Sequence, residues 1–380
     1  MKKRNIQISS PSLGKEEWQA LKEPIETGWL TSGPKVKEFE EAFAKRHNTE
    51  HAIAVTSATT ALHLALSSIG IKPGDQVIVP AFTWVSSANV VLYQGADLVF
   101  CDIDSSTFNV DPKKLKTKIT NKTKAIIVVH LFGLCAPIDD IKKVSGEIPL
   151  IEDCACAAGS AYKDLSAGSL GLMGCFSFHP RKSITTGEGG IITTNDNFLA
   201  NKLKVLRNHG ASISEEERHN GPMPFILPDF NVLGYNYRMT DLQGAIGKVQ
   251  LKKLDSFINE RDKWARYYKK ELAGISWVKL PEFSKDYKHG WQSFVILIEE
   301  SKSPISRNNI MEQLQLKGIS TRPGTHAVHM LGYYSKKYNI SPEDYPEAKI
   351  ANNQSISIPL HNEMKKEDFE YVVFCLKNIK

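Results

Sequence analysis

Short apolar segments alternate with segments of helical spacing over roughly the first 250 residues. The apolar segments are rich in β-branched residues and are bounded by Gly, Pro or Asp, which predicts strands at 76–80, 97–101, 124–130, 148–153 and 174–178. Several are apolar at consecutive positions, as is typical of strands buried on both faces. Between them, residues 59–66 have the spacing of a helix. The alternation predicts an α/β fold in which helices flank a mostly parallel central sheet.

A change in the pattern near residue 255 predicts a second, smaller domain. A long amphipathic helix begins near Thr240, and the sequence pattern changes along it. The segments that follow predict a strand at 291–298 and helices at 308–316 and 366–376. Because 380 residues exceed the usual size of one domain, we predict a large domain over 1–255 and a small α+β domain over 256–380.

Composition and charge exclude several classes of protein. Hydrophobic residues make up 41% and charged residues 24%, which is ordinary for a globular protein and unlike a disordered or fibrous chain. The net charge of +6 comes from scattered basic residues without interleaved aromatic ones, so we expect no nucleic-acid binding. No apolar run approaches the roughly 18–20 residues of a membrane-spanning helix, so we expect no membrane partner. No apolar stretch follows the basic start, Met1–Ile6, which argues against a secretory signal.

The six cysteines predict neither disulfides nor a metal site. No Cys-x-x-Cys pair occurs, which favours reduced cysteines and a cytoplasmic protein. His326 and His329 are three residues apart and could face a metal ion from one side of a helix. However, Pro323 and Gly324 indicate a loop there, and no third ligand is evident. The glycine-rich fingerprints of dinucleotide and P-loop sites are also absent.

Four short segments stand at predicted strand ends or helix starts, where parallel sheets usually place their active sites. In the first, Ser57 and Thr59 open a helix, and the free backbone N–H groups there could bind a phosphate. The same residues would also serve as ordinary N-caps. In the second, Trp84 follows a strand and could stack on a planar ring, or pack into the core or an interface.

The third segment ends a buried strand with Asp153, where a carboxylate is costly unless it is paired. Asp153 could bond to a pyridinium nitrogen or cap a helix, and its neighbour Glu152 is expected to point elsewhere. In the fourth segment, Lys182 lies just past a buried strand, as a Schiff-base lysine would. The alternative is an ordinary surface lysine on a loop.

An anion site, an aromatic face, a strand-end carboxylate and a strand-end lysine, in this order, are the parts of a pyridoxal-phosphate site. In combination the motifs resemble those of the DegT/DnrJ/EryC1/StrS family of sugar aminotransferases, within the fold-type I aminotransferases. The resemblance runs nearly from end to end, through Gly28–Pro34, Ser57–Thr59, Glu152–Asp153, Phe176–Lys182, Thr186–Gly190, Gly234–Thr240 and Ser357–His361. It implies a fold-type I transferase that uses pyridoxal 5'-phosphate.

The resemblance also implies a role for each matching residue. Lys182 binds the cofactor covalently, Asp153 pairs with the pyridine nitrogen, and Trp84 stacks on the ring. The other implied cofactor contacts are Ser57, Ala58, Thr59, Cys156, Ser177 and Asn236. Among them, Asn236 reaches the phosphate of the neighbouring subunit, which implies a homodimer with shared active sites. The alternative is that Asn236 only caps the next helix.

One position departs from the family pattern. Cys156 stands near the ring hydroxyl of the cofactor, where many relatives carry Gln or His, and a thiol is a weak hydrogen-bond donor. Another group or a water molecule would then replace that contact. Lys182 follows the pattern of the aminotransferases, because some relatives have His at this position and act as dehydratases.

The resemblance implies an amino-acid donor, glutamate, and a nucleotide-linked keto-sugar as acceptor, in amino-sugar biosynthesis for a secondary metabolite or a surface polysaccharide such as lipopolysaccharide O-antigen. Two alternatives stay open: a non-nucleotide ketone such as a ketocyclitol as acceptor, or a regulatory homologue that binds the cofactor without turnover. Candidate substrate contacts are His179, Arg181, Arg322, His326 and His329. For Arg322, His326 and His329 the alternative is ordinary loop packing. The polar stretches 212–219 and 221–224 are expected at the edge of the active site, with a solvent-exposed linkage as the alternative.

Overall fold

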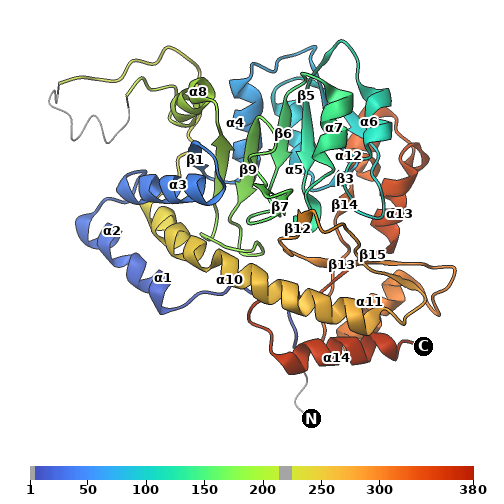
Figure 1. The fold of residues 1–380 in the computed structure, drawn as a ribbon. Coiled ribbons are helices and arrows are strands. Elements are labelled where there is room, and N and C mark those ends of the chain that lie inside the picture. The colour runs from blue at the N-terminus through green and yellow to red at the C-terminus, as the bar shows by residue number, and fades with distance from the viewer. Residues whose placement is uncertain (1–4, 214–224) are drawn as a thin grey trace.

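A seven-stranded sheet lies at the centre of the computed structural model, which describes residues 5–213 and 225–380 (Figure 1). The strand order is β1-β10-β9-β6-β5-β2-β4. The strands are β1 (His51–Val55), β2 (Gln76–Pro80), β4 (Asp97–Cys101), β5 (Thr123–Val129), β6 (Leu150–Asp153), β9 (Met173–Ser177) and β10 (Gly190–Thr194). The pairs from β4 to β9 are parallel, whereas β10 runs antiparallel to both β9 and β1. The predicted mostly parallel sheet is confirmed.

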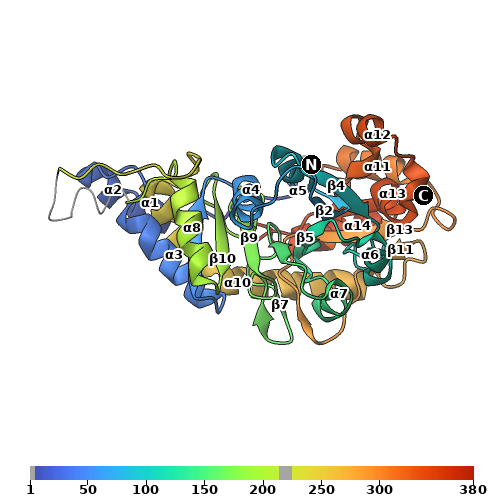
Figure 2. The ribbon, with the colours of Figure 1, turned by 90° about the horizontal axis from the view of Figure 1, so that it is seen from above.

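The strands contribute to two hydrophobic cores, one on each face of the sheet. In β5, Ala125 and Ile127 belong to one core, and Ile126 and Val128 belong to the other, which explains why the run is continuously apolar. The first core includes α4 (Ala58–Ser68), α5 (Ser86–Tyr93) and α8 (Asn197–Arg207). The second includes α3 (Pro34–Arg46), α6 (Pro112–Lys118), α7 (Ile138–Ser145) and α10 (Asp241–Leu272). Figure 2 shows α4 and α7 on opposite sides of the strands.

The 32-residue helix α10 connects the central sheet to a second α+β unit. Its predicted start is confirmed, because Thr240 caps it by accepting a hydrogen bond from the backbone N–H of Gln243. The second unit contains β11 (Val278–Lys279), β13 (Phe294–Ile298), β15 (Ser355–Ile358), α11 (Arg307–Leu316) and α14 (Lys366–Lys377). The strand predicted at 291–298 thus begins at Phe294, and both predicted helices are present. The predicted domain division at residue 255 falls inside α10 and stays a prediction.

The remaining elements are short. They are α1 (Lys15–Ala20), α2 (Lys22–Thr27), β3 (Phe82–Thr83), β7 (Ala161–Tyr162), β8 (Leu165–Ser166), β12 (Tyr287–Lys288), β14 (His326–Ala327), α12 (Gly332–Tyr338), α13 (Pro346–Gln354) and 3-10 turns at Leu131–Gly133, Val328–Met330 and Pro342–Asp344. Within the two described ranges, no helix is both long and apolar enough to cross a membrane. The loop predicted at 212–219 and 221–224 lies outside the described residues, apart from 212 and 213.

Candidate functional site

The predicted cofactor residues lie along one edge of the central sheet. Gly190, the first residue of β10, pairs with Val55 at the end of β1 and with Ser177 at the end of β9. Asp153 ends β6 and pairs with Cys175 of β9. The start of α4, the end of β9 and the end of β6 are therefore neighbours, at the carboxyl ends of the parallel strands (Figure 1).

The first turn of α4 has the features of an anion site. Ser57 is its N-cap, since Ser57 Oγ accepts a hydrogen bond from Thr60 N at 3.1 Å. The N–H groups of Ala58 and Thr59 are in the first turn, where a helix offers them no backbone acceptor. A Cβ at Gly190 would lie under 3.0 Å from the Ser57 carbonyl and the Ala58 nitrogen. The glycine therefore lets β10 approach the start of α4 closely. Because the Ser57 cap accepts from Thr60 N, the N–H groups of Ala58 and Thr59 are available to a phosphate.

Asp153 has few partners for a buried carboxylate. Its side chain is 5% exposed, and Asp153 Oδ1 accepts a hydrogen bond from Ala155 N at 3.1 Å. Asp153 Oδ2 accepts one from Ser87 Oγ at 2.7 Å, and Ser87 Oγ lies 3.1 Å from Thr83 Oγ1. The sequence reasoning missed Ser87 and Thr83. The hydroxyl residues near Trp84 were the available signal, but the contact of Ser87 with Asp153 spans 66 positions of the chain.

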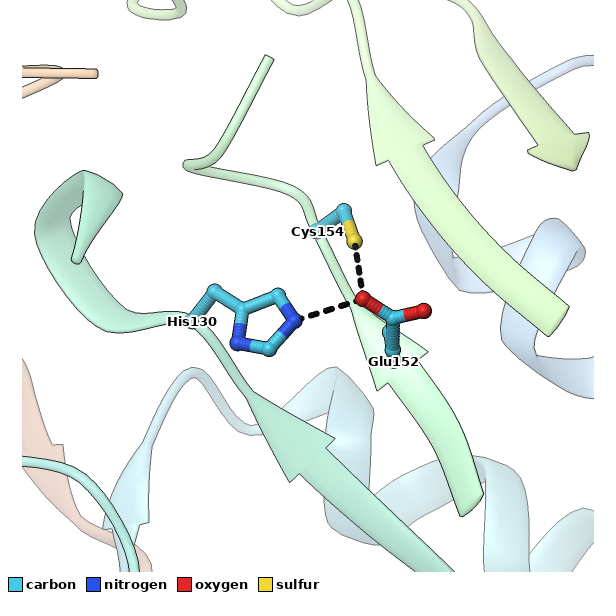
Figure 3. A group of neighbouring side chains, drawn as sticks. All are labelled: His130, Glu152 and Cys154. Atoms are coloured by element: carbon cyan, nitrogen blue, oxygen red, sulfur yellow. Dashed lines mark hydrogen bonds and ion pairs between the residues drawn. The ribbon is translucent and has the colours of Figure 1, made fainter. Parts of the chain in front are cut away.

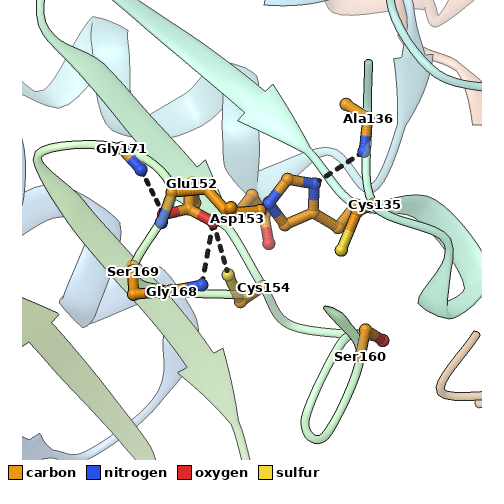
Figure 4. Close-up of polar contacts among 12 residues, drawn as sticks. Cys135, Ala136, Glu152, Asp153, Cys154, Ser160, Gly168, Ser169 and Gly171 are labelled. Atoms are coloured by element: carbon orange, nitrogen blue, oxygen red, sulfur yellow. Dashed lines mark hydrogen bonds and ion pairs between the residues drawn. The ribbon is translucent and has the colours of Figure 1, made fainter. Parts of the chain in front are cut away.

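Glu152 points away from Asp153 and lies in a polar cluster of its own (Figure 4). The Glu152 carboxylate is fully buried and accepts hydrogen bonds from Gly168 N at 2.8 Å, Leu170 N at 2.8 Å and Gly171 N at 2.6 Å. The prediction that Glu152 points elsewhere is confirmed. These contacts fix the loop between β8 and β9 against β6, so Glu152 stabilises the strand from which Asp153 projects.

The same carboxylate contacts His130 and Cys154, and Figure 3 shows the three side chains together. His130 Nε2 lies 2.8 Å from Glu152 Oε2, and His130 Nδ1 accepts a hydrogen bond from Ala136 N at 3.0 Å. The proton of a neutral His130 is therefore on Nε2, and the ring donates it to Glu152. Burial raises the pKa of Cys154 well above its usual range, so the thiol also donates. This arrangement leaves neither imidazole nitrogen free to bind a metal.

Lys182 is half-buried in the turn after β9, and Lys182 Nζ donates a hydrogen bond to Cys156 Sγ at 3.4 Å. Cys156 is partly exposed, whereas the other five cysteines are buried, and none of the six forms a disulfide. His179 shapes the turn, because Lys182 N donates to His179 O and Arg181 N donates to His179 Nδ1. Burial lowers the pKa of His179, so the ring acts there as a neutral acceptor.

The remaining predicted substrate contacts, which are Arg181, Arg322, His326 and His329, do not all lie near the predicted cofactor contact Trp84. Trp84 is 58% exposed, and its ring meets that of His326 edge to face at a centroid distance of 5.4 Å. Arg181 and Arg322 are exposed. His329, by contrast, is fully buried, and His329 Nε2 lies 3.3 Å from the carbonyl of Pro342. The structure therefore places His326 beside Trp84 but turns His329 into the core, and the two histidines form no metal site.

Asn236 is exposed and pairs with Asn208 of its own chain through a backbone bridge. The next residue, Tyr237, accepts a hydrogen bond from Thr56 N at 3.1 Å, so this segment lies beside the start of α4. Thr240 rather than Asn236 caps α10. The alternative interpretation of Asn236 as the cap of the next helix is therefore wrong.

A family model described as the DegT/DnrJ/EryC1/StrS aminotransferase family matches residues 11–377. This chain belongs to that family. The spore coat polysaccharide biosynthesis protein SpsC of Bacillus subtilis (strain 168) is 37% identical over 384 residues, covering 100% of this chain and 98% of SpsC.

Solved structures agree with membership of the DegT/DnrJ/EryC1/StrS family. The putative sugar aminotransferase Spr1654 from Streptococcus pneumoniae, in its PMP form, is 29% identical with a TM-score of 0.90, covering 98% of this chain and 97% of that one. Spr1654 has also been solved in a PLP form. A variant of the GDP-4-keto-6-deoxymannose-3-dehydratase ColD with bound GDP-perosamine is 28% identical with a TM-score of 0.89, covering 98% and 100%. The chain is a fold-type I, pyridoxal-phosphate-dependent aminotransferase of the sugar aminotransferase family.

The residues at the sheet edge fit the chemical groups of pyridoxal phosphate. The start of α4 beside Gly190 suits the phosphate, because its N–H groups and dipole favour an anion. Asp153 is a buried acceptor that suits a protonated ring nitrogen. Lys182 presents an amine between Cys156 and the solvent, and Trp84 presents an exposed aromatic face.

Proposed function

We propose that this aminotransferase moves an amino group from an amino acid, glutamate, to a nucleotide-linked keto-sugar. The observation that supports it most is the arrangement of Asp153, Lys182 and the start of α4 along one sheet edge. Two relatives support the acceptor class: ColD is a dehydratase of a GDP-linked keto-sugar, and SpsC is named for polysaccharide biosynthesis. Use in a surface polysaccharide or a secondary metabolite stays a prediction, as does a cytoplasmic location.

In this proposal each residue has a defined task. Pyridoxal phosphate, when bound, supplies a ring that accepts electrons from the carbon next to the substrate nitrogen. Lys182 would hold the resting cofactor covalently. Once the donor's amine displaces it, the free Lys182 amine would take the proton from the donor's α carbon and deliver it to the cofactor carbon that the lysine had held. Asp153, as an anion, keeps a proton on the ring nitrogen through a charge-assisted hydrogen bond. Trp84 covers one face of the ring.

The phosphate and the ring hydroxyl take the remaining contacts. Ala58 and Thr59 supply backbone N–H groups, and Ser57 and Ser177 supply hydroxyls, at the anion site described above. Cys156 borders the ring hydroxyl, where its thiol is a weaker donor than the Gln or His of relatives. Since Cys156 Sγ lies 3.4 Å from Lys182 Nζ, it also limits where the lysine can move.

A second copy of the chain completes the proposed site. Asn236 is exposed beside the start of α4, and from there it reaches the phosphate of the neighbouring subunit. The described residues just before it include unusually exposed apolar side chains, which are Phe225, Leu227, Phe230, Val232 and Leu233, the last 88% exposed. Such a contiguous apolar stretch is typical of a surface covered by a partner. We therefore propose a homodimer with shared active sites.

Hybrid dimers test this arrangement. Lys182→Ala and Asn236→Ala are each expected to abolish or strongly reduce turnover, measured as keto-acid formation from glutamate. If Asn236 acts across the interface, a refolded mixture of the two variants regains turnover, because one site per hybrid has both residues intact. A mixture of Lys182→Ala with Asp153→Asn is the matched control and stays inactive, since both residues come from one subunit. No recovery in the first mixture would place Asn236 in its own subunit's site.

The acceptor is tested with purified holoenzyme, glutamate and a panel of UDP-, dTDP- and GDP-linked keto-sugars alongside free ketocyclitols. Turnover of a nucleotide-linked sugar is expected. Turnover of free ketocyclitols alone would overturn the acceptor class and keep the aminotransferase. Retained cofactor with no amino transfer from any donor would indicate a regulatory homologue. Variants of His179, Arg181, Arg322 and His326 that raise the KM for the sugar alone would mark the acceptor surface.

A further inference from the structure

Ser87 is a buried hydroxyl with a direct contact to Asp153. It belongs to the first turn of α5, has no exposed surface, and donates a hydrogen bond from Oγ to Asp153 Oδ2 at 2.7 Å. A serine hydroxyl has one proton, and that proton goes to Asp153. Ser87 Oγ must therefore be the acceptor in its 3.1 Å contact with Thr83 Oγ1. The three side chains form a directed series in which Thr83 donates to Ser87 and Ser87 donates to Asp153.

We propose that Ser87 is a positioning residue for Asp153, and that Thr83 orients Ser87. The inference rests on the proposed role of Asp153 at the ring nitrogen of the cofactor. Asp153 has one backbone donor, at Oδ1, so the Ser87 hydroxyl is the contact that fixes Oδ2. Hydrogen bonds in series strengthen one another in a buried site, and these donate toward the carboxylate. They therefore hold the Asp153 carboxylate in one orientation as an acceptor at the edge of the sheet.

The same segment also carries the aromatic face of the site. Trp84 lies between Thr83 and Ser87, so five consecutive residues position both the ring-stacking side chain and the support of Asp153. The segment is fixed from outside, because β3 pairs with β14 and Thr325 Oγ1 donates to the carbonyl of Thr83 at 3.2 Å. The short backbone segment from Thr83 to Ser87 thus helps to set the position of the Trp84 ring relative to the Asp153 carboxylate.

The test compares Ser87→Ala with Ser86→Ala, the neighbouring serine of the same helix, which is not bonded to Asp153. Loss of one hydrogen bond to a charged group corresponds to roughly 10–100-fold, so Ser87→Ala should lower kcat by about that factor with little change in KM for glutamate. The second readout is the absorption spectrum of the bound cofactor, followed against pH. Ser87→Ala should shift the midpoint of that titration, and Ser86→Ala should not. Thr83→Val, which keeps the shape of threonine, should produce a smaller change in the same direction.

A double-mutant cycle with Asp153→Asn decides whether Ser87 acts through Asp153. If it does, Ser87→Ala adds no further loss of kcat and no spectral shift in the Asp153→Asn background. Losses that multiply, or a spectrum that Ser87→Ala leaves unchanged in the native background, would overturn the inference alone. Wild-type turnover in Asp153→Asn would overturn the proposed role of Asp153 and the inference with it. Thermal unfolding of each cofactor-free variant detects misfolding, and if Ser87→Ala does not fold, Thr83→Val takes its place in the cycle.

Discussion

Glu152 and Asp153 are neighbours on β6, yet the strand directs them to opposite faces of the sheet. Glu152 accepts hydrogen bonds from three backbone N–H groups, one imidazole and one thiol, and its side chain is fully buried. Asp153 accepts one backbone and one hydroxyl hydrogen bond at the edge where the cofactor residues meet. The comparison shows that the position of a carboxylate on a strand decides whether it supports the fold or remains available to a ligand.

The largest effect is expected from Glu152→Gln. An amide has one accepting oxygen, so at least two of the buried donors around residue 152 lose their acceptor. At about 1–3 kcal/mol for each unpaired donor, the free energy of unfolding should fall by roughly 2–6 kcal/mol. Urea unfolding measures it, with Glu147→Gln, an exposed position just before the same strand, as the control. Equal stability of the two variants would contradict the structural role of Glu152.

Asp153→Asn should change activity instead of stability. The amide keeps the shape and can still accept from Ser87, but it cannot supply the negative charge that holds a ring proton. Removing one such electrostatic contact costs roughly 100-fold or more in kcat, which corresponds to about 2.7 kcal/mol. Single-turnover kinetics with glutamate measures it. A variant that loses as much stability as Glu152→Gln would remove the contrast between the two carboxylates.

His130→Phe tests the imidazole contact of Glu152. Phenylalanine fills the volume but leaves Ala136 N without an acceptor and removes one donor from Glu152. We expect a loss of about 1–3 kcal/mol in unfolding free energy, because one buried group becomes unpaired. His51→Phe on β1, where the ring contacts Asn197 at the surface, is the control and should cost less. A neutral His130→Phe would mean that the backbone donors alone hold Glu152.

The smallest effects are expected from Cys154→Ser and from a chelator. The Cys154 thiol contacts Glu152 at 3.8 Å, and a hydroxyl can replace it as donor, so the free energy of unfolding should change by less than about 1 kcal/mol. Dialysis against a chelator should leave the thermal midpoint unchanged, because both nitrogens of His130 already have hydrogen-bond partners. A lower midpoint after chelation would show that the cluster binds a metal.

The parallel strands β2, β4, β5, β6 and β9 were predictable because each is a short apolar run between turn residues, and the same runs located the ends at which Asp153 and Lys182 lie. The antiparallel strand β10 was not predicted. The limits of elements were less predictable. The strand predicted from Trp291 begins only at Phe294, because Trp291 has a φ of 47° and stacks on His289. A local pattern cannot reveal such a backbone conformation, since it is imposed by packing.

Long-range contacts account for what the sequence could not show at the site. Ser87 lies far from Asp153 along the chain, and nothing in its local pattern separates it from the helix-capping serines found elsewhere. His329 looked equivalent to His326, but a 3-10 turn at Val328–Met330 directs it into the core beside Phe100 and Tyr345. The family resemblance identified residues that contact the cofactor directly. It did not identify Ser87 and Thr83, which we propose to act through Asp153.

Helix α10 has a mechanical consequence. At 1.5 Å per residue its 32 residues extend about 48 Å, and one uninterrupted helix packs against α3 near its start and α14 near its end. Its sequence contains no proline, and Gly244 and Gly247 lie at the close approach to α3 rather than at mid-length. Any hinge motion between the central sheet and the second α+β unit would have to bend helix α10. We therefore expect the central sheet and the second α+β unit to move as one body.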